Sequence, residues 1–256
     1  MLKNMMLFRG NIMTDPVSDN RTALNRNTLK YIAAAAMILD HIAMYFMNAG
    51  DNAPLYAALR SIGRLTAPIM CFFLASGFQY TSSRKKYGQR LLIFALISQL
   101  PYMLAHYPHA SLLDMNMIFT LFLSFVMLEL YEHIGNDALK WTAVTAVIML
   151  SAFGDWGIIA PLWVLMFYRY RDDRKKQLIS YSVLCVLTVA SDIYFCVSHH
   201  YHWYGELWQA GVFLAVPLFL LYDGRGGRKS GFSKWFFYIL YPSHLAAIGL
   251  IRLLIN

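Results

Sequence analysis

Long apolar runs separated by short polar segments dominate the pattern of this chain. Most of the runs approach the twenty or so residues that a helix needs to cross a bilayer. The pattern therefore predicts an all-α fold, a polytopic transmembrane helical bundle of about nine spans. The runs fall at residues 29–47, 62–80, 91–107, 115–133, 141–154, 157–170, 177–198, 207–222 and 235–255.

Two of these runs are shorter than the others. Residues 141–154 and 157–170 meet at Gly154, Asp155, Trp156 and Gly157. We expect them to form either a tight helical hairpin or a re-entrant pair.

Lys and Arg are distributed unequally between the two predicted sides of the membrane. Nineteen of the 22 fall on one side, and three, Arg60, Arg64 and Arg252, fall on or near the other. Because cytoplasmic loops carry an excess of Lys and Arg, we expect the amino terminus inside and the carboxyl terminus outside. Shifting the count by one span would destroy the asymmetry, which supports nine spans.

The segment before the first apolar run is polar and mixed, and no small-residue cleavage pattern follows that run. We therefore expect a cytoplasmic segment at residues 1–28 and no removable signal peptide. Residues 29–256 are expected to form a single transmembrane domain that begins with a permanent span.

Composition agrees with a membrane protein, since 58% of residues are hydrophobic and 14% are charged, against about 25% charged in soluble domains. The net charge of +8 resides in short loops, so it indicates topology rather than nucleic-acid binding. The three cysteines lie in apolar runs without metal-ligand spacing, and His199, His200 and His202 lack an acidic or cysteine partner. We expect no metal cofactor.

The first apolar run contains two ionisable residues, Asp40 and His41. Such residues at membrane depth are costly and usually face a bundle interior or a watery cavity. Helix rise places His41 about 18 Å from Leu29, in the outer half of the membrane. His41 is either a structural histidine bonded to a neighbouring helix or a functional group. Asp40 either acts on the tautomer of His41 through another residue or pairs with an arginine.

The last run contains a second histidine at a similar depth. His244 lies about 15 Å along a helix from Lys234, and Pro242 is expected to kink that helix. Arg64 lies near the outer end of the second run. It is either an interface anchor or a cation that pairs with Asp40 or stabilises an oxyanion.

Two basic loops lie on the predicted inner side, at residues 82–90 and 223–229. Such loops usually set orientation, but Arg also binds phosphate oxygens in a bidentate manner, and glycines let the backbone approach a phosphate. The basic candidates for an anionic ligand are Arg84, Lys85, Lys86, Arg90, Arg225 and Arg228.

Several segments, in order over residues 29–248, resemble the TraX family, whose namesake is a pilin acetylase. They are LKYIAAAAMILDHIAMYF, GRLTAPIMCFFLASGF, DMNMIFTLFL, DWGIIAPLWVLMFY, ELWQAGVFLAVPLFLLYDGRGG and KWFFYILYPSHL. The histidine late in the first run, the FFLASGF segment and the basic loop after it are more distantly similar to the acyltransferase-3 class of membrane acyltransferases.

The resemblance implies a multi-pass acetyltransferase of the bacterial inner membrane, with acetyl-CoA as co-substrate. It places His41 at the catalytic histidine of the acyltransferase-3 class and residues 84–90 at its arginine pair. Arg84 and Arg90 are six apart, rather than forming a clean RxxR. Other residues fall on TraX motif positions whose roles the resemblance does not assign: Arg64, Asn116, Thr120, Asp155, Tyr241, Pro242 and His244.

The implied reaction moves an acetyl group to an amine or hydroxyl of a pilin-like peptide or envelope molecule. CoA phosphates would bind the inner basic loops, and His41 would act as general base. Arg64 or His244 would stabilise the oxyanion. Two alternatives stay open: a proton-coupled transporter that uses Asp40, His41 and His244, and a non-catalytic envelope or pilus assembly factor.

Overall fold

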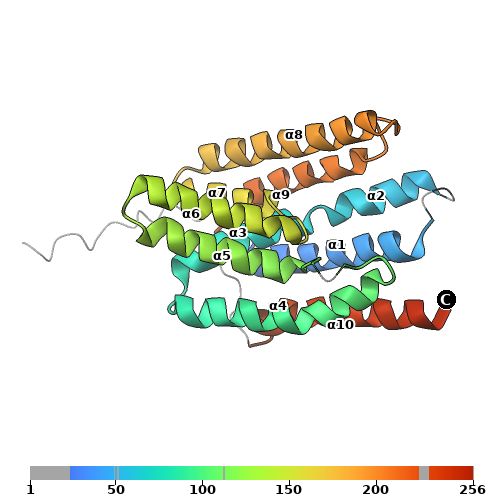
Figure 1. Cartoon of the computed structure of the whole chain (residues 1–256), viewed down its shortest axis with the longest axis horizontal. Helices are drawn as coiled ribbons and strands as arrows, with labels where there is room; N and C mark the ends of the chain where they lie inside the picture. The colour runs from blue at the N-terminus through green and yellow to red at the C-terminus, as the bar shows by residue number, and fades with distance from the viewer. Residues whose placement is uncertain (1–23, 49, 51, 112, 225–230, 256) are drawn as a thin grey trace, which may run out of the picture.

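The computed structural model describes residues 24–48, 50, 52–111, 113–224 and 231–255, with side chains except at 231–234. Helices lie side by side along one long axis (Figure 1). In the described part of the chain, two isolated bridges, Leu24 with Tyr222 and Met115 with Gly154, are the only β-pairings. The all-α prediction is therefore confirmed for these residues.

Each predicted apolar run forms helical structure. Six runs match one α-helix each, and the other three are divided between two elements. The helices are α1 (Arg26–Phe46), α2 (Ala53–Gly63), α3 (Thr66–Tyr80), α4 (Arg84–His106), α5 (Met117–His133), α6 (Asp137–Leu150), α7 (Ile159–Arg169), α8 (Arg174–Ser198), α9 (Ala215–Leu221) and α10 (Gly231–Ile255), with 3-10 segments η1 (Ser151–Phe153) and η2 (Leu207–Leu214).

The largest departure from the predicted boundaries is in the second run. Helix α2 begins at Ala53, nine residues before the predicted start, because the Asn52 side chain caps it and Pro54 suits its first turn. The chain then turns briefly at Arg64 and Leu65 before α3. An apolar-run criterion missed α2 because its apolar part, APLYAAL, is short and is separated from the next apolar run by Arg60 and Ser61.

Polar caps explain why several other helices begin before their apolar runs. The Asn25 side chain accepts from the amides of Asn27 and Thr28 at the start of α1. Ser83 caps α4 and Asp173 caps α8 in the same manner.

Four helical segments of the described chain are long and apolar enough to cross a membrane, judged by length and composition. They are Arg26–Phe46, Ala53–Tyr80, Arg174–Ser198 and Trp235–Ile255. The segments Ile159–Arg169 and Leu207–Leu221 are apolar but shorter. These features fit a membrane protein.

The bundle has two distinguishable ends. Helices α1, α4 and α8 begin at one end, with Arg26, Arg84 and Arg174 in their first turns, and we name it the basic end. Helices α1, α8 and α10 finish at the other, the far end, where the carboxyl terminus lies (Figure 1).

Helices α5, α6 and α7 stop short of the far end (Figure 1). The turn between α6 and α7 is bonded to the start of α5: the Met115 amide donates to Phe153 O, and the Asp155 amide donates to Met115 O, both at 2.8 Å. A Cβ at Gly154 would lie 2.1 Å from Thr120 Oγ1, so only glycine allows this approach. The α6–α7 turn is thus held inside the bundle.

Candidate functional site

The two histidines singled out in the sequence are in contact. Nε2 of His244 on α10 lies 2.8 Å from Nδ1 of His41 on α1. The two rings are 4.8 Å apart between centroids, at an interplanar angle of 29°. Helix rise predicted similar depths for the two histidines but not their contact.

A group of aromatic and basic side chains covers the far-end side of the histidine pair. Tyr45, one turn beyond His41, stacks on its ring with centroids 5.8 Å apart. The Tyr45 hydroxyl lies 2.9 Å from Nε2 of His106. The Arg252 guanidinium lies 5.3 Å from the centre of the Tyr45 ring. These contacts join α1, α4 and α10 on the far-end side of the pair.

Asp40 pairs with two arginines of α2 and its end. Arg60 Nη1 donates to Asp40 Oδ1 at 2.7 Å, and Arg64 Nη2 donates to Oδ1 at 2.8 Å and to Oδ2 at 2.7 Å. No more than 8% of any of the three residues is exposed. Of the two roles considered for Asp40, the geometry favours the direct pairing with arginine.

This buried cluster carries one net positive charge close to His41. Trp208 lies under both guanidinium groups, at 4.2 Å from Arg60 and 4.7 Å from Arg64. Arg64 Nη1 also donates to the Gln209 side chain at 3.3 Å. Cation–π contacts and the shared carboxylate thus offset part of the cost of burying two arginines.

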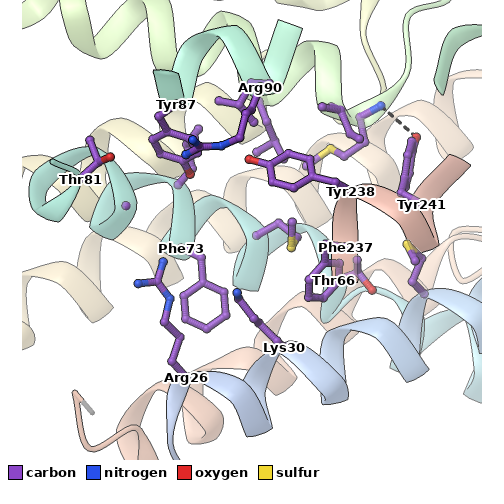
Figure 2. Close-up of a pocket in the computed structure, with 18 of the residues that line it drawn as sticks. Arg26, Lys30, Thr66, Phe73, Thr81, Tyr87, Arg90, Phe237, Tyr238 and Tyr241 are labelled. Atoms are coloured by element: carbon purple, nitrogen blue, oxygen red, sulfur yellow. Dashed lines mark hydrogen bonds between the residues drawn. The ribbon is translucent and has the colours of Figure 1, made fainter. Parts of the chain in front are cut away.

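A cavity of about 510 Å³ runs from the basic end toward the histidine pair. Its basic-end part is lined by three cations, Arg26, Lys30 and Arg90, which Figure 2 shows around one space. Its lining also includes Met37, one turn before His41, and Tyr241, three residues before His244. The volume and the mostly apolar lining are typical of a small-molecule site.

Motif positions at the deep end of the cavity support its shape. The Met117 amide donates to the Tyr241 hydroxyl at 3.1 Å, the dashed line in Figure 2. Asn116 caps α5 and donates through Nδ2 to Ala95 O at 2.8 Å. These bonds tie the start of α5 to α4 and α10.

Asp155 occupies the turn between α6 and α7, where two neighbours have positive φ: Trp156 at 55° and Ile158 at 44°. Thr120 Oγ1 donates to the Asp155 carbonyl at 2.8 Å. Among the described residues Asp155 has no ion pair within 4 Å. Strained backbone held this firmly is common at functional sites.

Of the described candidate phosphate ligands, one lines the cavity and three lie outside it. Arg90 lines the cavity, but Arg84 pairs with Glu132 and lies 4.0 Å from the Phe78 ring centre. Lys85 and Lys86 are exposed, and Lys85 lines a separate depression beside Glu129 and His133. Arg225 and Arg228 lie outside the described residues.

Sequence reasoning did not predict that Arg26 and Lys30 line a cavity. It also missed Arg60 as a partner of Asp40. Arg60 and Arg64 are four residues apart and so share one helix face, a spacing that could have indicated a common acidic partner.

The described residues hold no group of three or more His, Cys, Asp or Glu side chains suited to a metal ion.

Comparison with known proteins gives two matches. A family described as "TraX protein" matches residues 25–252, a range that contains both histidines and the cavity. The probable fimbrial assembly protein FimC, serogroup H1, of Dichelobacter nodosus is 33% identical over 231 residues, which is 86% of this chain and 92% of that protein. No solved structure matches the chain.

Proposed function

This chain belongs to the TraX family, and we propose that it is an integral membrane acetyltransferase. It transfers an acetyl group from acetyl-CoA to an amine or hydroxyl of an acceptor. One observation carries the proposal: a cavity with a cationic mouth runs from the basic end as far as Met37 and Tyr241, which lie about one helical turn before the paired histidines His41 and His244.

The cavity suits the donor. Arg26, Lys30 and Arg90 at the mouth match the phosphates of CoA, since guanidinium and ammonium groups bind phosphate oxygens. Lys30 and His41 are separated by about 16 Å along α1, a depth that the extended pantetheine arm spans. The thioester then lies near His41 while the nucleotide stays at the mouth.

His41 acts as the general base. It takes the proton from the acceptor as that group attacks the thioester carbonyl. The tetrahedral intermediate then collapses, the carbon–sulfur bond breaks, and the CoA thiolate receives the proton from His41. Atoms and charges balance without a further reactant.

The two residues considered for the oxyanion have other bonds. Arg64 binds Asp40 and Gln209, and His244 binds His41. The net positive charge of the Asp40–Arg60–Arg64 cluster therefore supports the developing oxyanion through its field, which is strong in a low-dielectric interior.

The orientation follows from the distribution of basic residues. We place the basic end in the cytoplasm, with the amino terminus inside, in the inner membrane. Helices α6 and α7 form a helical hairpin whose turn is held level with the start of α5, so the pair reaches as far toward the outer side as α5 does. The hairpin returns to the side on which it began and leaves the orientation of later spans unchanged.

The acceptor is a pilin-like or fimbrial peptide or another envelope molecule. The name of the relative, a probable fimbrial assembly protein, favours the former. The same name favours a second candidate, a non-catalytic fimbrial assembly factor. That candidate predicts a stable partner and no dependence on His41. The remaining alternative, a proton-coupled transporter, predicts no release of CoA from acetyl-CoA.

The test is the substitution His41→Ala in purified, folded protein. Loss of the base is expected to lower acetyl transfer by about 10²–10⁴-fold and to leave acetyl-CoA binding unchanged. The measurement is CoA release and acetyl incorporation into an acceptor peptide.

The matched control is His199→Ala, which removes an exposed histidine near the far end. It is expected to keep wild-type transfer. Wild-type transfer by the His41 variant would refute the assigned base.

A further inference from the structure

The hydrogen bonds of His244 reveal which of its ring nitrogens carries a proton. Nδ1 of His244 lies 2.9 Å from the carbonyl oxygen of Leu240, one turn earlier on α10. A carbonyl oxygen can only accept, so Nδ1 of His244 must be the donor. A neutral imidazole has one N–H, and Nε2 of His244 is then an acceptor.

The protonated nitrogen of His41 follows from its contact with His244. Nε2 of His244 accepts across the 2.8 Å contact, so Nδ1 of His41 must donate. The proton of neutral His41 is therefore on Nδ1, and Nε2 keeps its lone pair. In the described residues no hydrogen bond joins Nε2 of His41 to another protein group.

The surroundings favour a neutral pair. Arg60 and Arg64 lie near enough to His41 to act on it electrostatically, and their cluster is already positive. A further positive charge on the histidines would be repelled inside a low-dielectric bundle. Both rings are therefore assigned as neutral before reaction.

We propose that His244 is a positioning residue that holds His41 in the tautomer with a free Nε2. The proposal rests on the proposed acetyl transfer, for which it identifies the reacting nitrogen. The acceptor's proton goes to Nε2 of His41, and the resulting imidazolium keeps its Nδ1–H bonded to Nε2 of His244. The proton on Nε2 then passes to the departing CoA thiolate, so His244 never gains one.

The ring of His244 is itself braced. The Tyr241 ring packs edge-on against it, with centroids 5.6 Å apart, and the Tyr241 hydroxyl accepts from the Met117 amide. Helix α10 also approaches α4 closely at Gly249. A Cβ added at Gly249 would lie only 2.6 Å from a side-chain carbon of Leu104. Contacts with α4 and α5 thus fix α10, and His244 on α10 fixes the ring of His41. In a hydrolase triad, the buried carboxylate orients the catalytic histidine in the same way.

Two substitutions of His244 separate positioning from packing. His244→Phe keeps a ring but has no acceptor, whereas His244→Gln places an amide oxygen near the position of Nε2. The phenylalanine variant is expected to lose at least about 10²-fold in kcat, with acetyl-CoA affinity unchanged. The glutamine variant is expected to recover most of that loss. Equal kcat in the two folded variants, or wild-type kcat in the phenylalanine variant, would overturn the proposal.

A direct reading of the tautomer keeps the proposal testable even if a variant does not fold. Nitrogen-15 NMR of wild-type protein with labelled histidine, assigned with His41→Gln, is expected to show protonated Nδ1 and unprotonated Nε2 at His41. A proton on Nε2 of His41 at neutral pH would contradict the assignment. Because this readout needs no turnover, it stands apart from the proposed function, whose own failure would appear as absent transfer by wild-type protein.

Discussion

At the residue scale, the Asp40 cluster shows how charge can be buried in an apolar helical bundle. One carboxylate is shared by two guanidinium groups, and Trp208 packs against both. Removing one partner from such a cluster leaves uncompensated charge, which costs far more than the intact pair contributes. The cluster therefore joins α1 to α2 only while all of its members are present.

The substitution Asp40→Asn is expected to destabilise the protein by about 3–5 kcal/mol, because two buried guanidinium groups lose their counter-charge. Thermal unfolding in detergent measures the change. Asp137→Asn is the matched control, because its pair with Lys140 at 2.9 Å is exposed on the aspartate side and contributes little. Equal stability of the two variants would contradict this account of the cluster.

Arg84 and Arg90, both near the start of α4, are expected to behave differently toward the donor. Arg90→Gln should weaken CoA binding by about 10- to 10²-fold, since loss of a charge-assisted phosphate contact costs about 1.5–3 kcal/mol. Arg84→Gln should leave affinity unchanged, because Arg84 already pairs with Glu132.

Titration calorimetry with CoA measures both constants for the arginine variants. The reverse order, with Arg84 the more important, would favour the loop contacts inferred from the resemblance over the cavity.

Sequence alone predicted part of this site. Counting helix rise from the basic ends of two runs placed His41 and His244 at one depth, and they are in contact. The role of Arg26 and Lys30 could not be predicted, because a cavity depends on the spacing of α3, α4 and α10 around α1. Hydropathy describes each helix separately and gives no information on the distances between helices.

At the element scale, close approach of backbones determines where helices cross. A Cβ at Gly63 would lie 2.2 Å from Cβ of Asp40, so α1 and α2 meet at a distance that only glycine permits. The approach brings Asp40 within reach of both arginines. The crossing and the ion cluster therefore depend on each other.

Gly63→Ala is expected to destabilise the protein by about 1–3 kcal/mol, the usual cost of overpacking a tight contact. Gly135→Ala is the matched control, since a Cβ added at Gly135 would meet nothing within 4 Å. The measurement is the unfolding midpoint of both variants in the same detergent. A midpoint for the Gly63 variant at or above that of the control would be inconsistent with the crossing described.

The sequence predicted which segments are helical better than it predicted where each helix begins and ends. Every apolar run forms a helix, because backbone groups in an apolar chain are satisfied most simply by helical hydrogen bonds. The start of α2, the break at Arg64 and the 3-10 segment η2 were not predicted. Each depends on local caps or on contacts with another helix, such as the approach of Gly211 to Ser61.

At the scale of the whole molecule, the two ends differ in chemistry. Cations line the cavity mouth at the basic end, while Tyr45, His106 and Arg252 are in contact on the far-end side of the histidine pair. The proposed donor would therefore approach the pair from the basic end. The unequal distribution of Lys and Arg already separated these ends in the sequence.

The central claim is that this cavity binds acetyl-CoA and delivers its thioester to His41. An electron cryomicroscopy structure of the purified protein with acetyl-CoA tests it most directly. The account predicts the phosphates beside Arg26, Lys30 and Arg90, and the thioester carbon within reach of Nε2 of His41. An empty cavity at saturating acetyl-CoA, or a ligand bound elsewhere with its thioester remote from His41, would contradict it.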